Sequence, residues 1–391
     1  MTRHRRILRT AGGILAVLLA IVLLGVPRES AEAPTYPPSG AHIPARPTAL
    51  QRDAVALRET WHLPALELCV VDADGIVDLA STGVRKAGST AAVTSGDLFH
   101  LGSMTKAMTA TMLATLVDEG QLSWDMTMVQ AFPAVAGVMD SRYRDVTLEQ
   151  LLTHTSGLPR YTTDPEWQSI PAFSGTPAQQ RQAFARMLLT RPPIGPAGVY
   201  RYSNAGYSLA AAIAERVTGE SWEELMQERL FGPLGITPHY GWPLLTSSDE
   251  PWGHHIKNAA VIPHDPADNY RVPTVLAPAG DVSLSILDYS VFARLHLAGL
   301  EGEDSAILSA KAIQRLHQPV LAYSCGWHEE LVDGVQTSWH RGTCDTFDTF
   351  VFLQPSRGVG VIAFTNADGD AAATLALFGE LSNLASIYQG R

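Results

Sequence analysis

The chain has 391 residues, of which 46% are hydrophobic and 17% charged, and this composition excludes an intrinsically disordered protein. Its net charge is −11, and five arginines without any acid among residues 1–28 leave −16 on the remainder. So acidic a body disfavours nucleic acid and anionic membrane surfaces as partners, and it most simply aids solubility.

Residues 1–33 have the pattern of a signal peptide or membrane anchor. Four arginines among the first nine residues precede an uncharged apolar run over 11–26, which is short for a membrane-spanning helix of about 20 residues. The small-x-small site Ala31-Glu32-Ala33 is followed by Pro34, which should hinder cleavage. We expect export to the periplasm or the outside, with the segment either removed or kept as an anchor in the cytoplasmic membrane. Residues 34–47 predict a Pro-rich linker.

The folded body is expected over 48–391 and begins with a helix and a hairpin. Thr48 and Gln51 have the spacing of a capping box, which predicts a helix start. Apolar runs on both sides of a turn at 72–75 indicate two antiparallel strands. The elements expected here are a helix over 48–61, strands over 66–71 and 76–81, and a long helix from Ser103 to Glu119 that Gly120 ends.

The middle of the chain predicts helices separated by Pro- and Gly-rich loops, and the last part returns to strands. Residues 238–278 hold many Pro and His with little periodicity, which predicts a long loop region. The remaining helices are expected over 205–217, 222–230, 286–297, 309–317 and 371–387, and the strands over 324–329, 336–340, 347–353 and 359–365.

This order of elements predicts an α/β (α+β) fold. The terminal strands would pair in one antiparallel sheet, the first and last helices would cover one of its faces, and the central helices would form a second, all-helical lobe. We expect the α/β part over about 48–124 and 291–391 and the helical part over about 125–290. A site is expected in the cleft between them.

Neither the cysteines nor the histidines have the spacing of a metal site. Cys325 and Cys344 could form a disulfide in an oxidising compartment, and the alternative is that these two and Cys69 are small buried thiols. The thirteen histidines, among them His254, His255 and His264, are expected to be solvated or to serve packing. We therefore expect no metal and no cofactor.

The first candidate for chemistry is Gly102-Ser103-Met104-Thr105-Lys106 at the start of a predicted helix. Residues i and i+3 share a helix face, so the hydroxyl of Ser103 and the amine of Lys106 can be neighbours. A serine hydroxyl needs a base to become a nucleophile, and a lysine whose pKa is lowered can serve. No GxSxG motif surrounds Ser103, which disfavours the α/β-hydrolase fold.

Two further motifs follow along the chain. In Tyr202-Ser203-Asn204, before a predicted helix, the phenol could move a proton and the Asn204 amide could hold a substrate carbonyl; a simple helix cap is the alternative. His340, Gly342 and Thr343 end a predicted strand, where Gly342 would let a substrate lie close to the strand edge. A backbone N–H beyond Gly342 could complete an oxyanion hole, and a buried histidine at an ordinary strand end is the alternative.

SxxK, YSN and HxG in this order resemble the serine β-lactamase and penicillin-binding-protein superfamily. The segments 151–158 (LLTHTSGL), 231–235 (FGPLG) and 277–281 (APAGD) are similar to landmarks of its class C-like branch, which includes β-lactamases, DD-carboxypeptidases, D-aminopeptidases and carboxylesterases. The likeness covers about 48–388. It implies a β-lactamase/transpeptidase-like fold and an acyl-serine intermediate without a cofactor.

The resemblance also implies a role for each motif residue, and it places the segment around His154 in the structural wall of the site. The implied roles are the acylated nucleophile for Ser103, a proton-sharing cation for Lys106, the general base and acid for Tyr202, substrate orientation for Asn204, the third motif for His340 and Gly342, and an oxyanion hole for the backbone N–H groups of Ser103 and Thr343.

The third motif departs from the family pattern. Many relatives carry K-T-G, whose lysine helps bind a substrate carboxylate, where this chain has His340-Arg341-Gly342. A histidine is mostly neutral at pH 7, and Arg341 would point to the other face of the strand, where Asp345 or Asp348 could pair with it. This favours an exported esterase or D-amino-acid peptidase for a small-molecule or peptide substrate, with weak or no β-lactamase activity. The alternatives are a β-lactamase proper, an acyl transferase and a non-catalytic ligand-binding or sensor protein.

Overall fold

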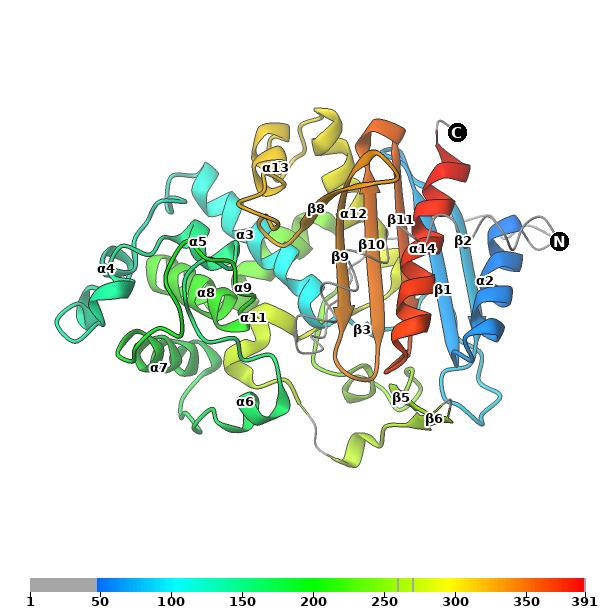
Figure 1. The fold of residues 1–391 in the computed structure, drawn as a ribbon, viewed down its shortest axis with the longest axis horizontal. Helices are drawn as coiled ribbons and strands as arrows, with labels where there is room; N and C mark the ends of the chain where they lie inside the picture. Colours follow the sequence, from blue (N-terminus) through cyan, green and yellow to red (C-terminus); the bar gives the residue numbers. More distant parts are fainter. Residues whose placement is uncertain (1–47, 259, 269–270, 390–391) are drawn as a thin grey trace.

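A computed structural model describes residues 48–258, 260–268 and 271–389, and it confirms the expected α/β architecture (Figure 1). One antiparallel sheet of six strands has the order β2-β1-β11-β10-β9-β8, and the helices of residues 128–280 lie beside it. The leader and linker expected over 1–47 lie outside the described residues, and the division of the body at 124 and 291 stays a prediction. The strands are β1 (Ala65–Val71), β2 (Ile76–Gly83), β8 (His328–Val332), β9 (Val335–Thr343), β10 (Asp348–Gln354) and β11 (Val359–Thr365).

Strand β1 shows how the sheet is covered on both faces. Leu66, Leu68 and Val70 pack in one core cluster, and Cys69 and Val71 pack in the other. Because side chains alternate along a strand, a strand buried on both faces has an almost continuous apolar run. As expected, the first and last helices cover one face. These helices are α2 (Ala49–Thr60) and α14 (Ala371–Tyr388), and the opposite face packs against α3 (Thr105–Asp118) and α12 (Ile286–Glu301).

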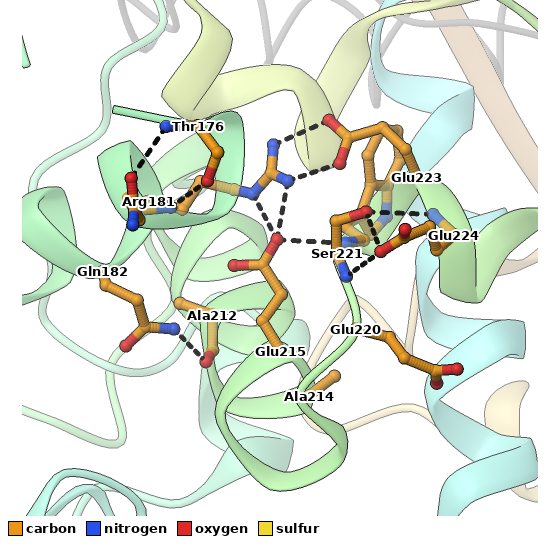
Figure 2. A network of polar contacts seen from close by, with 12 residues as sticks. Thr176, Arg181, Gln182, Ala212, Ala214, Glu215, Glu220, Ser221, Glu223 and Glu224 are labelled. Atoms are coloured by element: carbon orange, nitrogen blue, oxygen red, sulfur yellow. Dashed lines mark hydrogen bonds and ion pairs between the residues drawn. The ribbon is translucent and has the colours of Figure 1, made fainter. Parts of the chain in front are cut away.

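The helical part is held together around one buried guanidinium. The side chain of Arg181 is fully buried on α7 and pairs with Glu215 of α8 and Glu223 of α9, each at 2.6 Å (Figure 2). Its Nη1 also donates to the carbonyl oxygen of Thr274 at 3.5 Å, just before α11. These helices are α7 (Pro177–Leu189), α8 (Asn204–Thr218), α9 (Trp222–Met226) and α11 (Ala277–Gly280), with the short α4 (Met128–Ala131), α5 (Leu148–Leu152), α6 (Asp164–Gln168) and α10 (Gly232–Leu234) around them.

Two expectations about local structure are wrong. Residues 238–278 are not one long loop, because short strands in this stretch join two small sheets of the order β12-β5-β6 and β3-β7-β4. The strand expected over 324–329 begins only at His328, because a turn precedes it. In this turn Gly326 has φ +92°, and a Cβ there would lie 2.4 Å from the backbone of Ala107. The small strands are β3 (Phe99–His100), β4 (His239–Tyr240), β5 (His254–Lys257), β6 (Ala260–Pro263), β7 (Val282–Leu284) and β12 (Ala367–Asp368).

Cys69, Cys325 and Cys344 are buried thiols, and none of them forms a disulfide. The structure therefore has three small buried thiols and not the Cys325–Cys344 disulfide that was the other possibility. Within the described residues, no helix has both the length and the apolar character needed to cross a bilayer.

Candidate active site

Ser103 lies in a buried 3-10 turn, Gly102–Met104; the α-helix that was expected to start at Ser103 begins only at Thr105, as α3, and Lys106 lies in its first turn. Nζ of Lys106 donates to Oγ of Ser103 at 2.5 Å and to the carbonyl oxygen of Ala279 at 2.9 Å. A Cβ on Gly280 would lie 3.2 Å from the backbone of Gly102, so the glycine lets α11 approach this turn closely. The spacing that the sequence offered therefore brings the hydroxyl and the amine together.

The amine of Lys106 is fully buried and lies against aromatic rings. Its Nζ is 4.7 Å from the ring centroid of Tyr202 and 5.6 Å from that of Tyr207. The face of an aromatic ring attracts a cation, so the two phenols help to hold the amine beside Ser103. Tyr202, which the sequence placed far along the chain, thus joins the first motif in space.

Tyr202 is positioned by the start of α8 and by His154. Oγ of Ser203 accepts from the N–H of Gly206 at 3.3 Å, so Ser203 is the helix cap that the sequence analysis offered as an alternative. The N–H of Ser203 donates to Nδ1 of His154 at 3.1 Å, and the imidazole packs against the Tyr202 ring at a tilt of 33°, with centroids 4.0 Å apart. His154 has φ +60°, which is uncommon for a residue other than glycine. It therefore contacts the second motif directly and supports it structurally.

The amide of Asn204 is oriented from one side only. Nδ2 donates to the carbonyl oxygen of Tyr161 at 2.7 Å, while Oδ1 is buried without a hydrogen-bond partner among the described residues. Buried polar atoms are almost always paired, so Oδ1 is a free acceptor for a ligand. A small hollow of about 10 Å³ runs past this amide and is lined by Ser103, Trp167, Asn204, Val272, Leu276, Ala279, Gly280 and Cys344.

The third motif lies on β9, which packs against the turn that carries Ser103. Strand β8 pairs with β9 only as far as Trp339, so among the described residues the outer edge of 340–343 has no neighbouring strand. Oγ1 of Thr343 donates to Oδ2 of Asp368 at 2.7 Å, and the carbonyl oxygen of Gly342 accepts from Oγ1 of Thr349 at 3.1 Å. The structure therefore places His340, Gly342 and Thr343 along an open strand edge.

His340 and Arg341 point to opposite faces, as expected. Arg341 pairs with Asp348 at 2.7 Å and with Asp368 at 3.0 Å, so it offers no charge to the face that carries His340. Nδ1 of His340 lies 2.7 Å from the carbonyl oxygen of Arg341, which can only accept, and Nε2 lies 3.0 Å from the phenol oxygen of Tyr323. His340 is therefore the Nδ1–H tautomer, and Tyr323 donates to Nε2.

Both imidazoles of the site are held neutral. Burial, followed by the nearby charge of Lys106, keeps the pKa of His154 well below its usual range. Burial, followed by His328 and Lys106, does the same to the pKa of His340. A neutral histidine costs less to bury than an imidazolium, and neither ring brings a second positive charge to the site.

Sequence reasoning missed three contributors. The carbonyl of Ala279 belongs to the segment 277–281 that was noted without a role, and His154 belongs to the segment 151–158 that was assigned to the wall. Tyr323 stood in no motif, although its ring lies 4.6 Å from that of His154 and 6.0 Å from that of Tyr202. Its place could be found only from the folded chain, because these rings come from three separate segments.

His254, His255 and His264, which the sequence analysis named as histidines outside any metal site, lie outside this cluster. His254 is buried on β5, where Nδ1 donates to the carbonyl oxygen of Asn366 at 2.7 Å and Nε2 accepts from the N–H of Ala87 at 2.9 Å, which is a packing role. His255 and His264 line a second hollow of about 450 Å³ together with Asp164, Ile256, Lys257, Asp345, Asp368 and Gly369. Within the described residues no group of three or more His, Cys, Asp or Glu has the arrangement of a metal site.

Comparison with known protein families gives a match over most of the chain. The model of the family described as Beta-lactamase matches residues 50–381. The chain belongs to the beta-lactamase family. The turn of Ser103, the segment before α8 and the end of β9 all lie inside the matched region, and the chain spans about three fifths of the length of several of the relatives it matches.

Two proteins and one solved structure, each with a different name, are similar to this chain. An unguisins hydrolase of Aspergillus campestris is 28% identical over 335 residues, which are 79% of this chain and 59% of that protein. Penicillin-binding protein 4 of Amycolatopsis lactamdurans is 28% identical over 343 residues, which are 83% of this chain and 87% of that protein. A crystal structure of the class C beta-lactamase from Rhodobacter sphaeroides has a TM-score of 0.68 at 20% identity and covers 86% of this chain and 99% of its own, which shows the shared fold.

Proposed function

We propose that the chain cleaves an ester or amide through an acyl-enzyme on Ser103, as an esterase or a peptidase for D-amino-acid-containing substrates. The observation that carries the proposal is the position of Nζ of Lys106, 2.5 Å from Oγ of Ser103 and 4.7 Å from the ring of Tyr202. A nucleophile, an amine and a phenol in one buried cluster are the parts that serine acylation needs.

In the proposed reaction, Oγ of Ser103 attacks the substrate carbonyl carbon while its proton passes to the Lys106–Tyr202 pair. The N–H groups of Ser103 and Thr343 stabilise the negative oxygen of the tetrahedral intermediate. When the intermediate collapses, the bond to the leaving group breaks, and that alcohol or amine takes the proton. Water then attacks the acyl carbon, and the same two side chains accept its proton and return one to Ser103.

Two features favour an acyl group that carries an amide. Oδ1 of Asn204 is a buried acceptor without a partner among the described residues and would accept an N–H of the substrate. The outer edge of 340–343 on β9 would pair with an extended substrate backbone, because a bare strand edge offers N–H and C=O groups in alternation. Both features suit a peptide-like substrate.

The charge of the site supports a preference for neutral substrates over β-lactams. The neutral His340 stands where a lysine would meet a substrate carboxylate, and Arg341 is engaged by two aspartates on the other face. We further propose that the protein is exported, with residues 1–33 as signal peptide or anchor, because an acyl-serine hydrolase of this class with a basic, apolar leader suits an extracytoplasmic peptide or ester.

The test is to incubate the full-length chain with a fluorophosphonate probe and to screen p-nitrophenyl esters, D-amino-acid amides, a D-Ala-D-Ala peptide and nitrocefin. We expect a single label on Ser103, turnover of esters or D-amides, and little turnover of nitrocefin. Ser103→Ala should lose the label and lower turnover by about a thousandfold or more, while Ser89→Ala on the surface should match the wild type. A chain that stays unlabelled would be a binding protein, and nitrocefin turnover equal to ester turnover would make it a β-lactamase.

A further inference from the structure

Tyr323 is a buried residue between α13 (Ala310–Leu316) and β8 and belongs to none of the three motifs. Its phenol oxygen lies 3.0 Å from Nε2 of His340. Its ring centroid lies 4.6 Å from that of His154 and 4.9 Å from that of His328. Packing against these two rings therefore holds the phenol oxygen beside His340, and the same phenol also contacts Tyr207.

The hydrogen bonds of His340 leave it nothing to give to a substrate. The ring has two nitrogens: Nδ1–H is taken by the carbonyl oxygen of Arg341, and the lone pair of Nε2 is taken by the phenol of Tyr323. Only protonation of Nε2 would create a second donor, and the phenol proton already occupies that position.

The other groups that face His340 also oppose a charge. Lys106 of α3 is a cation, while His328 of β8 and His154 are further imidazoles. On the neighbouring strand β10, the residue paired with His340 is the apolar Val351. Of the groups named here that face the ring, none is an acid that would favour an imidazolium.

We propose that Tyr323 sets the charge selectivity of the site: by occupying Nε2 of the neutral His340, whose Nδ1–H is already taken by Arg341, it leaves β9 without a side-chain donor for a substrate carboxylate. The substrates are then esters or amides whose leaving group carries no carboxylate. This inference rests on the proposed function and narrows its substrate class. Tyr323 acts through His340 and is a positioning residue.

The experiment compares phenyl phenylacetylglycinate with its 3-carboxyphenyl counterpart, whose leaving group carries a carboxylate, between pH 5.5 and 8. For the wild type, the ratio of kcat/KM for the acid to that for the neutral ester should stay low and independent of pH. Tyr323→Phe removes the phenol from Nε2, and the negative charge of a bound substrate carboxylate can then favour a proton there in spite of burial and Lys106. The ratio should therefore rise about tenfold at pH 5.5 and much less at pH 8, since hydrogen bonds to charged groups are the strong ones.

The control is the double variant Tyr323→Phe/His340→Gln, with His340→Gln alone beside it. A glutamine cannot gain a charge, so the pH-dependent part of the ratio should vanish in both variants. If the double variant keeps that dependence, or if Tyr323→Phe slows both esters equally at every pH, the proposal is overturned and Tyr323 is structural.

A measurement on the wild type does not depend on any variant being folded and active. Nitrogen-15 shifts of the His340 imidazole, assigned by their loss in His340→Gln, should show a protonated Nδ1 and an unprotonated Nε2 from pH 5.5 to 8. An Nε2–H tautomer, or a titration midpoint above pH 6, would overturn the proposal. A wild type that hydrolyses neither ester would contradict the proposed function instead, and the nitrogen shifts would then decide whether Tyr323 holds His340 neutral.

Discussion

The imidazole of His154 packs against the phenol ring of Tyr202, and its Nδ1 accepts a hydrogen bond from the N–H of the next residue, Ser203. One side chain thus holds both the ring and the backbone of the second motif. Because α8 begins at Asn204, the ring of Tyr202 is fixed relative to the helix that carries the Asn204 amide. The predictions below test the parts of this assembly and the scaffold that holds it.

Tyr202→Phe should lower kcat/KM for the best ester by about a hundredfold or more, because it removes a phenol that takes part in proton transfer and keeps the ring that packs on His154. The matched control is Tyr200→Phe, two residues earlier and 36% exposed, which should stay within about threefold of the wild type. Steady-state kinetics with thermal melts would check both variants. Equal effects of the two changes would remove the phenol of Tyr202 from the reaction.

Lys106→Met should abolish acylation of Ser103, because methionine fills similar space without a nitrogen to hydrogen-bond to Oγ. We expect the rate of fluorophosphonate labelling to fall by about a thousandfold, the size typical of a lost catalytic group. Lys311→Met, on the exposed side of α13, is the control and should label normally. Rapid labelling of Lys106→Met would show that another group activates the serine.

Arg181→Met should destabilise the fold by about 3–5 kcal/mol, because it leaves the buried Glu215 without its cation. Burial already raises the pKa of Glu215, so this carboxyl depends on its partner to stay charged. In contrast, Arg58→Met breaks the pair of Arg58 with the exposed Glu59 and should cost less than about 1 kcal/mol. Urea unfolding of both variants measures the difference. Similar losses would mean that the network of Figure 2 contributes no more than a surface pair.

The stability of the folded protein should depend on pH because of the buried carboxyl of Asp288. Burial raises the pKa of this carboxyl, in the first turn of α12, to about 6, whereas an aspartate in the unfolded chain titrates near about 4. The folded state therefore keeps the proton that the unfolded chain releases between these values. As a result, the contribution of Asp288 to stability is full below pH 4 and is lost as the pH rises to 6.

Asp288→Asn should therefore flatten the fall in the free energy of unfolding between pH 4 and 6 and leave the slope above pH 6 unchanged. Urea unfolding at half-unit steps of pH gives the two profiles. The control is Asp118→Asn at the exposed end of α3, whose profile should run parallel to that of the wild type. Parallel profiles for all three proteins would contradict the prediction.

The spacing of residues along the sequence was enough to predict much of the candidate site. SxxK lies within one turn of helix, so neighbourhood in sequence became neighbourhood in space for Ser103 and Lys106. Tyr202 and Asn204 were found because a turn before an apolar helix is a strong pattern, and strand periodicity placed His340 and turned Arg341 away from it. The hairpin of β1 and β2, the cap of α2 at Thr48 and the terminal strands were predicted for the same reason.

Two of the contacts that complete the site join segments more than a hundred residues apart, and no local pattern encodes them. The carbonyl of Ala279 reaches Lys106 across 173 positions of the chain, and Tyr323, just before the turn that was expected to be a strand, lies against His154. In the same way, β5 and β6 are two four-residue strands that gain their pairing from each other and from β12. In residues 238–278 the prolines hid these strands, because proline weakens any strand signal.

The position of β1 in the sheet has a consequence for how the chain is made. Its neighbours are β2, which follows it directly, and β11, whose Thr365 pairs with Leu66 almost 300 residues later (Figure 1). A ribosome therefore releases a hairpin with one bare apolar edge long before the strand that covers it exists. Closing so long a loop is slow, and the uncovered edge can pair with other chains meanwhile. The edge of β1 therefore stays unpaired until β11 has been synthesised, and only then can the six-stranded sheet form.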